Sequence, residues 1–168
     1  MVGRSVPENL RMVHGQMVHA CEQAGRSFDS VRLIAVSKFV ESNRIVEAHR
    51  GGIRDFGENY VQEAIEKQGH LPPECASIQW HFIGRLQSNK LKHVLLHFQW
   101  IHSVDSVEKT LALDGKAGEL NVRPNVLLQI NIANEPTKGG FHARNFVQTA
   151  ADGEQYKYLW FNGVPAAR

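Results

Sequence analysis

The sequence predicts an α/β protein built on a parallel β-sheet. Short apolar segments alternate with amphipathic segments along the chain, and no internal repeat, linker or low-complexity tract interrupts the alternation. Parallel strands need crossover helices, and such crossovers are right-handed. The pattern fits either an open doubly wound sheet or part of a (β/α) barrel. The length predicts one domain, residues 1–168.

The first predicted element is an amphipathic helix from Ser5 to about Gly25, because its apolar residues recur at steps of three and four. Ser5 and Glu8 have the spacing of a capping box, and Pro7 suits a first helical turn. Short apolar runs then predict strands at 33–37, 53–56, 78–83, 99–103, 125–131 and 158–164. The amphipathic segments between them predict helices at 41–50, 59–68, 86–97, 105–117 and 142–151.

Composition narrows the class of protein. The net charge is +2 with acidic and basic residues interleaved, which predicts no nucleic-acid partner. No apolar run approaches the length of a membrane span, and the N-terminus "MVGRSVPENL" lacks the apolar run of a signal peptide, so we expect no membrane partner. Cys21 and Cys75 have neither disulfide-framework nor zinc-site spacing. Free thiols favour a reducing compartment, and we expect a cytoplasmic protein.

Lys38 is the first candidate site residue, because ligands bind at the carboxyl ends of parallel strands. Ile34, Val36 and Lys38 alternate onto one face of the predicted strand, which places the lysine at its end. A partly desolvated lysine amine can form a Schiff base with an aldehyde. The alternative is a solvated lysine that merely ends the strand.

Polar residues follow three other predicted strands. Asn59, after Gly57, is either a helix cap or a residue that also meets a ligand. The polar helix start at 87–90 either holds an anion or is a solvated first turn. Gln129 and Asn131 share one strand face, and Lys138 follows in a glycine-containing loop. We predict no metal site: His93 and His97 fit surface residues, and His81 fits a hydrogen-bonded core residue.

Six motifs occur in order: "LIAVSK", "FGENYVQEAIEK", "WHFIGRLQSNK", "VDSVEK", "LLQINIANEPTKGG" and "FNGVP". In this order and spacing the chain resembles the YggS/PROSC family of pyridoxal-phosphate-binding proteins, related to the N-terminal domain of alanine racemase. The resemblance implies a (β/α) TIM-type barrel with an extra N-terminal helix. It implies pyridoxal 5′-phosphate as the cofactor, with Lys38, in "AVSK", forming the Schiff base. The predicted cofactor-binding residues are therefore Lys38, Asn59, Asn131 and Lys138.

The resemblance implies a role in vitamin B6 and amino-acid homeostasis without robust catalytic activity. Two alternatives stay open: a racemase-like enzyme, in which Lys38 is one of two proton-transfer groups, or a paralogue that has lost the cofactor and acts as an interaction partner. The chain reads "SKFVE" where the family usually reads "SKTKP", and "TKGG" where it usually reads "SKSG".

The family's phosphate-binding segments follow "GVP", but the sequence ends at Arg168. We therefore expect a barrel that is truncated after about six strands, since the complete fold has eight. The family implies a monomer, whereas the open strand edges of a short barrel predict self-association.

Overall fold

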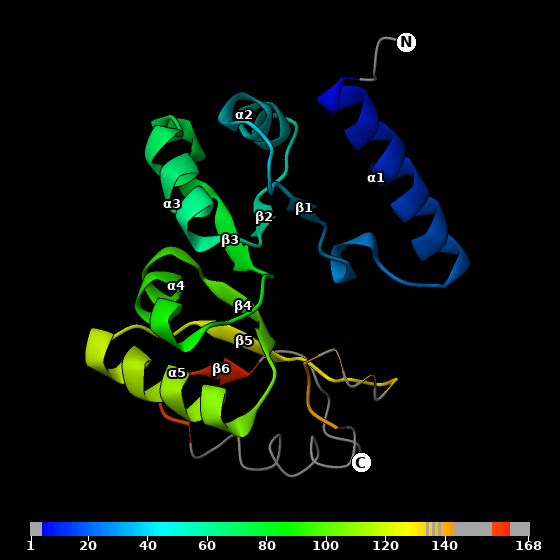
Figure 1. Cartoon of the computed structure of the whole chain (residues 1–168). Helices are drawn as coiled ribbons and strands as arrows, with labels where there is room; N and C mark the ends of the chain where they lie inside the picture. The colour runs from blue at the N-terminus through cyan, green and yellow to red at the C-terminus, as the bar shows by residue number, and fades with distance from the viewer. Residues whose placement is uncertain (1–4, 134, 136, 138, 143–155, 162–168) are drawn as a thin grey trace. The chain divides into compact units, whose positions relative to one another are not determined.

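The computed structural model describes residues 5–133, 135, 137, 139–142 and 156–161. These residues form two compact units (Figure 1). The first contains residues 5–57 and 62–79, and the second contains residues 58–61 and the described residues from 80 onward. In both units the strands pair in parallel, which confirms the α/β class predicted from the alternating segments.

The first unit begins with α1 (Val6–Gln23), and the predicted capping box is present. The Ser5 backbone N–H donates to Glu8 Oε2 at 2.8 Å, and the Glu8 N–H donates back to Ser5 Oγ at 3.4 Å. Strands β1 (Ile34–Val36) and β2 (Asp55–Glu58) pair from Ile34 opposite Asp55 to Val36 opposite Gly57. The helices α2 (Ser42–Arg50) and α3 (Val61–His70) each follow one of these strands.

The second unit carries the strands β3 (Gln79–Phe82), β4 (Trp100–Val104), β5 (Asn125–Leu128) and β6 (Trp160–Phe161), paired in chain order. The helices α4 (Leu91–His97) and α5 (Val107–Leu120) lie on the same side of these strands (Figure 1). This βα order is that of a (β/α) barrel. The core between strands and helices consists of fully or almost fully buried side chains, among them Phe82, Val94, Phe98, Ile101, Leu113 and Val126.

Several boundaries differ from the sequence-based expectation. The helix predicted at 86–97 begins with a 3₁₀ turn, Ser88–Lys90, in which the Lys90 N–H donates to the Gln87 carbonyl at 2.9 Å. The strand predicted at 125–131 ends at Leu128, because the residues after it hydrogen-bond within a loop. Most of the helix predicted at 142–151, and the end of the strand predicted at 158–164, lie outside the described residues.

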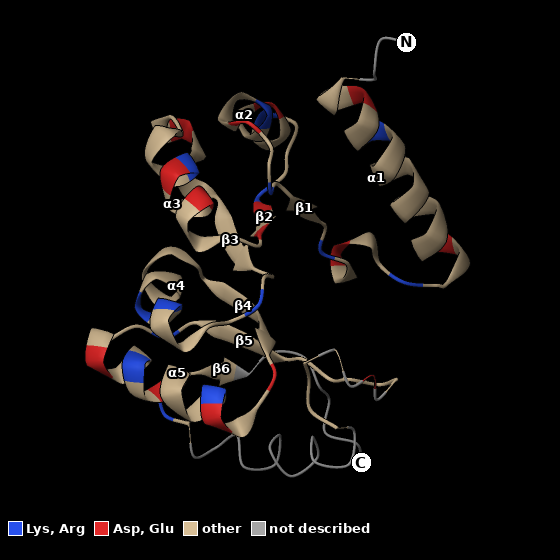
Figure 2. Cartoon of the chain, viewed as in Figure 1, with Lys and Arg blue, Asp and Glu red and all other residues tan. Residues whose placement is uncertain are grey.

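Cys21 and Cys75 are both free and buried. Within the described part of the chain, no group of three or more side chains is arranged to hold a metal ion. None of the helices described is long and apolar enough to cross a membrane. Along α5, the charged residues Glu108, Lys109, Asp114, Lys116 and Glu119 alternate in sign rather than forming one basic face (Figure 2).

Candidate functional site

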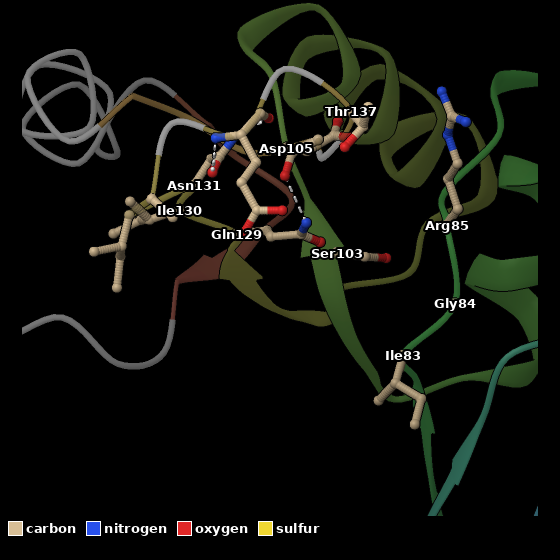
Figure 3. A pocket seen from close by; sticks show the side chains of 13 residues that line it. Ile83, Gly84, Arg85, Ser103, Asp105, Gln129, Ile130, Asn131 and Thr137 are labelled. Atoms are coloured by element: carbon tan, nitrogen blue, oxygen red, sulfur yellow. Dashed lines mark hydrogen bonds between the residues drawn. The ribbon is translucent and has the colours of Figure 1, made fainter.

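The second unit contains a cavity of about 480 Å³ at the carboxyl ends of β3, β4 and β5 (Figure 3). Its volume lies within the range of about 300 to 1,000 Å³ that is typical of small-molecule sites. Ligands of parallel α/β proteins bind at this end of the strands. The polar side chains lining it are those of Arg85, Ser103, Asp105, Gln129, Asn131, Glu135 and Thr137.

The end of β4, which contributes Ser103 and Asp105 to the cavity, pairs irregularly with β5. Ile101 lies opposite Val126 on β5, whereas Val104 lies opposite Leu128. One strand therefore advances three residues while its partner advances two, which is the signature of a β-bulge. Ser103 lies within this irregular stretch and Asp105 follows the strand, and both side chains line the cavity.

Ser103 and Asp105 differ in how their polar atoms are satisfied. Ser103 is 6% exposed, and its Oγ has no hydrogen-bond partner among the described residues. An unsatisfied buried hydroxyl costs about 1 to 3 kcal/mol, so a ligand that bonds to it would gain affinity. The Asp105 carboxylate instead forms an ion pair with Lys109 of α5 at 2.7 Å. Ser103 is therefore a side chain of the cavity with unused hydrogen-bonding capacity for a ligand.

Two amide side chains shape the loop after β5. Gln129 donates from Nε2 to the Gly139 carbonyl at 2.8 Å. Asn131 donates from Nδ2 to the Glu135 carbonyl at 2.9 Å and accepts the Glu135 N–H at 3.2 Å. Both amides line the cavity, as predicted from their shared strand face, although they lie beyond the end of β5. Their hydrogen bonds hold the loop that forms one wall of the cavity (Figure 3).

We predict that Asn131→Ala will loosen this loop. The substitution removes both side-chain bonds to Glu135, and a typical protein hydrogen bond contributes about 0.5 to 1.5 kcal/mol. The exchange rate of the Glu135 amide hydrogen, measured by NMR, should rise about tenfold. Asn131→Asp keeps the acceptor for the Glu135 N–H and should show a smaller increase. Equal protection in wild type and Asn131→Ala would contradict the role assigned to this side chain.

Gly84 and Asn59 approach each other closely beside the cavity. A Cβ added to Gly84 would lie 2.0 Å from the Asn59 carbonyl oxygen, so only glycine fits there. The Asn59 Oδ1 is buried and accepts no hydrogen bond from the described residues, which shows that the expected helix cap through this oxygen is wrong. Gly84 lines the cavity, whereas Asn59 is not among its lining residues.

Lys38 lies in the first unit, two residues beyond the end of β1. It is exposed and forms part of a turn with Phe39. The prediction that a lysine follows the carboxyl end of the first strand is therefore correct, although the strand itself ends at Val36. Lys138, the remaining predicted site residue, lies outside the described residues.

Some cavity residues were not predicted from the sequence. Arg85, Ser103 and Asp105 follow β3 or lie at the end of β4, and Glu135 and Thr137 belong to the loop after β5. A search for polar residues after every predicted strand would have found "SVD" at 103–105. Such a search would not have shown that these side chains line one cavity with residues after β3 and β5, because that depends on how the strands pair.

His81 and His102 form a hydrogen-bonded pair on β3 and β4. His81 is 1% exposed, and its Nδ1 lies 2.9 Å from His102 Nε2. The His81 ring also stacks on Trp100, with 5.5 Å between ring centroids. The expectation of a hydrogen-bonded core histidine at position 81 is confirmed. Burial, helped by the neighbouring His81, lowers the pKa of His102 from 6.5 to about 4.

The pKa of His102 predicts a specific loss of stability in acid. The unfolded chain binds a proton near pH 6.5 and the folded chain near pH 4, so acidification between these values favours unfolding. We expect a loss of about 1 to 2 kcal/mol, below the roughly 3 kcal/mol of a fully buried histidine, because solvent screens this partly exposed ring. Urea unfolding of wild type and His102→Gln at pH 7 and pH 5 measures the difference. A variant as sensitive to acid as wild type would rule out this contribution.

The strands pair in parallel, a helix follows each of β1 to β4, and a cavity lies at the carboxyl ends of β3, β4 and β5. These features define a ligand-binding protein of the (β/α)-barrel class. Residues 15–165 match the family model described as alanine racemase, N-terminal domain, and the chain belongs to this family. The six sequence motifs indicated a family related to this domain, and the match confirms that prediction.

Relatives with known names agree with this assignment. The pyridoxal phosphate homeostasis protein of Pseudomonas aeruginosa is 38% identical over 162 residues, which cover 96% of this chain and 70% of that protein. Among solved structures, PipY of Synechococcus elongatus PCC7942 with PLP bound has a TM-score of 0.74 at 37% identity, over 88% of this chain and 68% of PipY. Alanine racemase of Clostridium difficile 630, at 13% identity and a TM-score of 0.62 over 79% of this chain and 35% of that chain, shares the fold alone.

Proposed function

We propose that this protein binds pyridoxal 5′-phosphate covalently at Lys38 and acts in vitamin B6 and amino-acid homeostasis rather than as a robust catalyst. The observation that carries the proposal is the position of Lys38, an exposed amine just beyond the carboxyl end of β1. Ligands bind at that end of the strands in (β/α) proteins. The names of the relatives support the cofactor and the role: one is a pyridoxal phosphate homeostasis protein, and PipY was solved with PLP bound.

Each of the two units contains groups that suit such a cofactor. When bound, it supplies an aldehyde that condenses with an amine and a phosphate that accepts hydrogen bonds. Lys38 provides the amine, and we propose cofactor-binding roles for Asn59, Asn131 and Lys138 as well. In the cavity of the second unit, the buried Ser103 hydroxyl has no hydrogen-bond partner among the described residues, and such a group is expected where a polar ligand binds.

Chemical reduction of the bond between the cofactor and its lysine tests the proposed covalent site. The protein is incubated with pyridoxal 5′-phosphate, reduced with borohydride, digested and mapped by mass spectrometry. We expect the pyridoxyl group on Lys38, and we expect Lys38→Arg, which keeps the charge, to lose the modification at this position. A stable adduct on another lysine, with Lys38 unmodified in the wild-type protein, would refute the proposal.

The proposal includes action in the cytoplasm. Cys21 and Cys75 are both buried and both free, in agreement with a protein that folds under reducing conditions. Burial, together with the charge of Glu74, raises the pKa of the Cys75 thiol, which keeps it in the unreactive protonated form.

A further inference from the structure

The turn that carries Lys38 has an unusual backbone. Ser37 is buried, and its N–H donates to the Gly57 carbonyl of β2 at 3.0 Å. The Val40 N–H closes the turn by donating to the Ser37 carbonyl at 3.0 Å. Between them, Phe39 adopts a φ of 59°, in the left-handed region that bulky residues rarely occupy. A strained conformation of this kind persists only where surrounding contacts hold it.

Two side chains of α3 supply these contacts. Lys67 Nζ donates to the Ser37 carbonyl at 2.6 Å, on the N-terminal side of Lys38. Glu63 Oε1 accepts the Phe39 N–H at 2.5 Å, on the C-terminal side. Lys67 Nζ also donates to the same Glu63 oxygen at 2.5 Å, which joins the two. We call this arrangement the Glu63–Lys67 clamp, because it holds the backbone on both sides of Lys38.

The clamp is partly removed from water, which strengthens it. Lys67 as a whole is 8% exposed, and the Glu63 side chain is 24% exposed. Hydrogen bonds between charged groups are stronger than neutral ones, and a low local dielectric strengthens them further. Burial alone raises the pKa of Glu63, but the bonds from Lys67 and Phe39 and the charge of Lys67 outweigh it, so the net pKa is lowered. Glu63 is therefore ionised at neutral pH.

The two lysines near this turn differ in availability. Lys38 is exposed, whereas Lys67 is buried and its Nζ donates to both the Ser37 carbonyl and Glu63. A buried amine whose hydrogens are engaged by a carbonyl and a carboxylate is not accessible to an aldehyde, whereas an exposed one is. The network thus keeps Lys67 in a structural role while it presents Lys38.

We propose that Glu63 and Lys67 are positioning residues that hold the Lys38 turn in the conformation required for covalent attachment of the cofactor. The inference rests on the proposed function of Lys38. A reacting group that is held in place reacts faster than a mobile one, because the cost of ordering has already been met in folding. Without the clamp, the Phe39 N–H loses its bond to Glu63, and we expect its left-handed conformation and the backbone that directs Lys38 to be held less firmly.

The test compares two substitutions on the same helix. Glu63→Ala removes the acceptor for the Phe39 N–H, whereas Glu66→Ala makes the same change at an exposed position of α3. Hydrogen exchange of the Phe39 amide, measured by NMR without cofactor, should be about tenfold faster in Glu63→Ala and unchanged in Glu66→Ala. This readout does not depend on the proposed function. Glu63→Gln retains a neutral acceptor, should give an intermediate rate, and carries the test if Glu63→Ala does not fold.

The second readout is the attachment reaction itself. After addition of pyridoxal 5′-phosphate, we expect Glu63→Ala and Lys67→Met to modify Lys38 about tenfold more slowly than wild type and to show a weaker induced circular dichroism of the bound cofactor. Lys67→Arg, which keeps a cationic donor, should recover part of the rate. Normal attachment rates and dichroism in folded variants with faster Phe39 exchange would overturn the positioning role. If wild type forms no adduct on Lys38, the proposed function fails, while the Phe39 exchange rate still tests the clamp.

Discussion

Gly84→Ala is expected to destabilise the second unit by about 3 kcal/mol, the upper end of the usual cost of overpacking and a large fraction of a typical domain's stability. The added Cβ would lie 2.0 Å from the Asn59 carbonyl oxygen and 2.7 Å from its carbonyl carbon. Both are backbone atoms, so no side-chain rotation relieves the overlap. Thermal and urea unfolding followed by far-UV circular dichroism measure the effect. Because Gly84 lines the cavity, any protein that does fold should also have a distorted site.

Gly115→Ala is the matched control for this prediction. Gly115 lies within α5 of the same unit, and a Cβ added there meets no atom within 4 Å. Alanine is a better helix former than glycine by about 1 kcal/mol, so this variant should be more stable than wild type. The same chemical change should therefore have opposite effects at positions 84 and 115. Equal stability of Gly84→Ala and wild type would show that the close approach of the two loops is unimportant.

Phe82→Ala is expected to lower the free energy of unfolding by about 3 to 5 kcal/mol, the usual cost of removing a buried phenylalanine ring. Phe82 lies on β3, is 2% exposed, and packs edge-to-face against Phe98 with 5.3 Å between ring centroids. No polar group is lost, so the effect reports packing alone. Equilibrium unfolding in urea gives the magnitude.

Leu96→Ala provides the comparison for Phe82→Ala. Leu96 belongs to α4 of the same unit but is 49% exposed. Its truncation should change stability by no more than about 0.5 kcal/mol, because surface substitutions away from special features usually have small effects. If both variants lost similar stability, Phe82 would not belong to the core that supports the cavity.

Much of the local structure could be predicted from the sequence, because its causes are local. The capping box of α1 involves only Ser5 and Glu8, three residues apart, and the structure contains it as predicted. The apolar runs predicted where the six strands lie along the chain, and the position of Lys38 after the first strand followed from the same pattern. The ends of elements were less accurate: the run 125–131 continues beyond the point where side-chain bonds to a loop terminate β5 at Leu128.

The surroundings of the candidate site residues were decided only by tertiary structure. Ser103 and Asp105 line one cavity with residues that follow β3 and β5, and only the pairing of these strands brings the three segments together. The clamp on the Lys38 turn joins Ser37 and Phe39 to residues 24 to 30 positions later, and side-chain periodicity on α3 does not reveal such a bond. Local pattern thus determined which segments form strands and helices. Contacts between distant residues determined how Lys38 is held, because a hydrogen bond depends on distance in space rather than on separation along the chain.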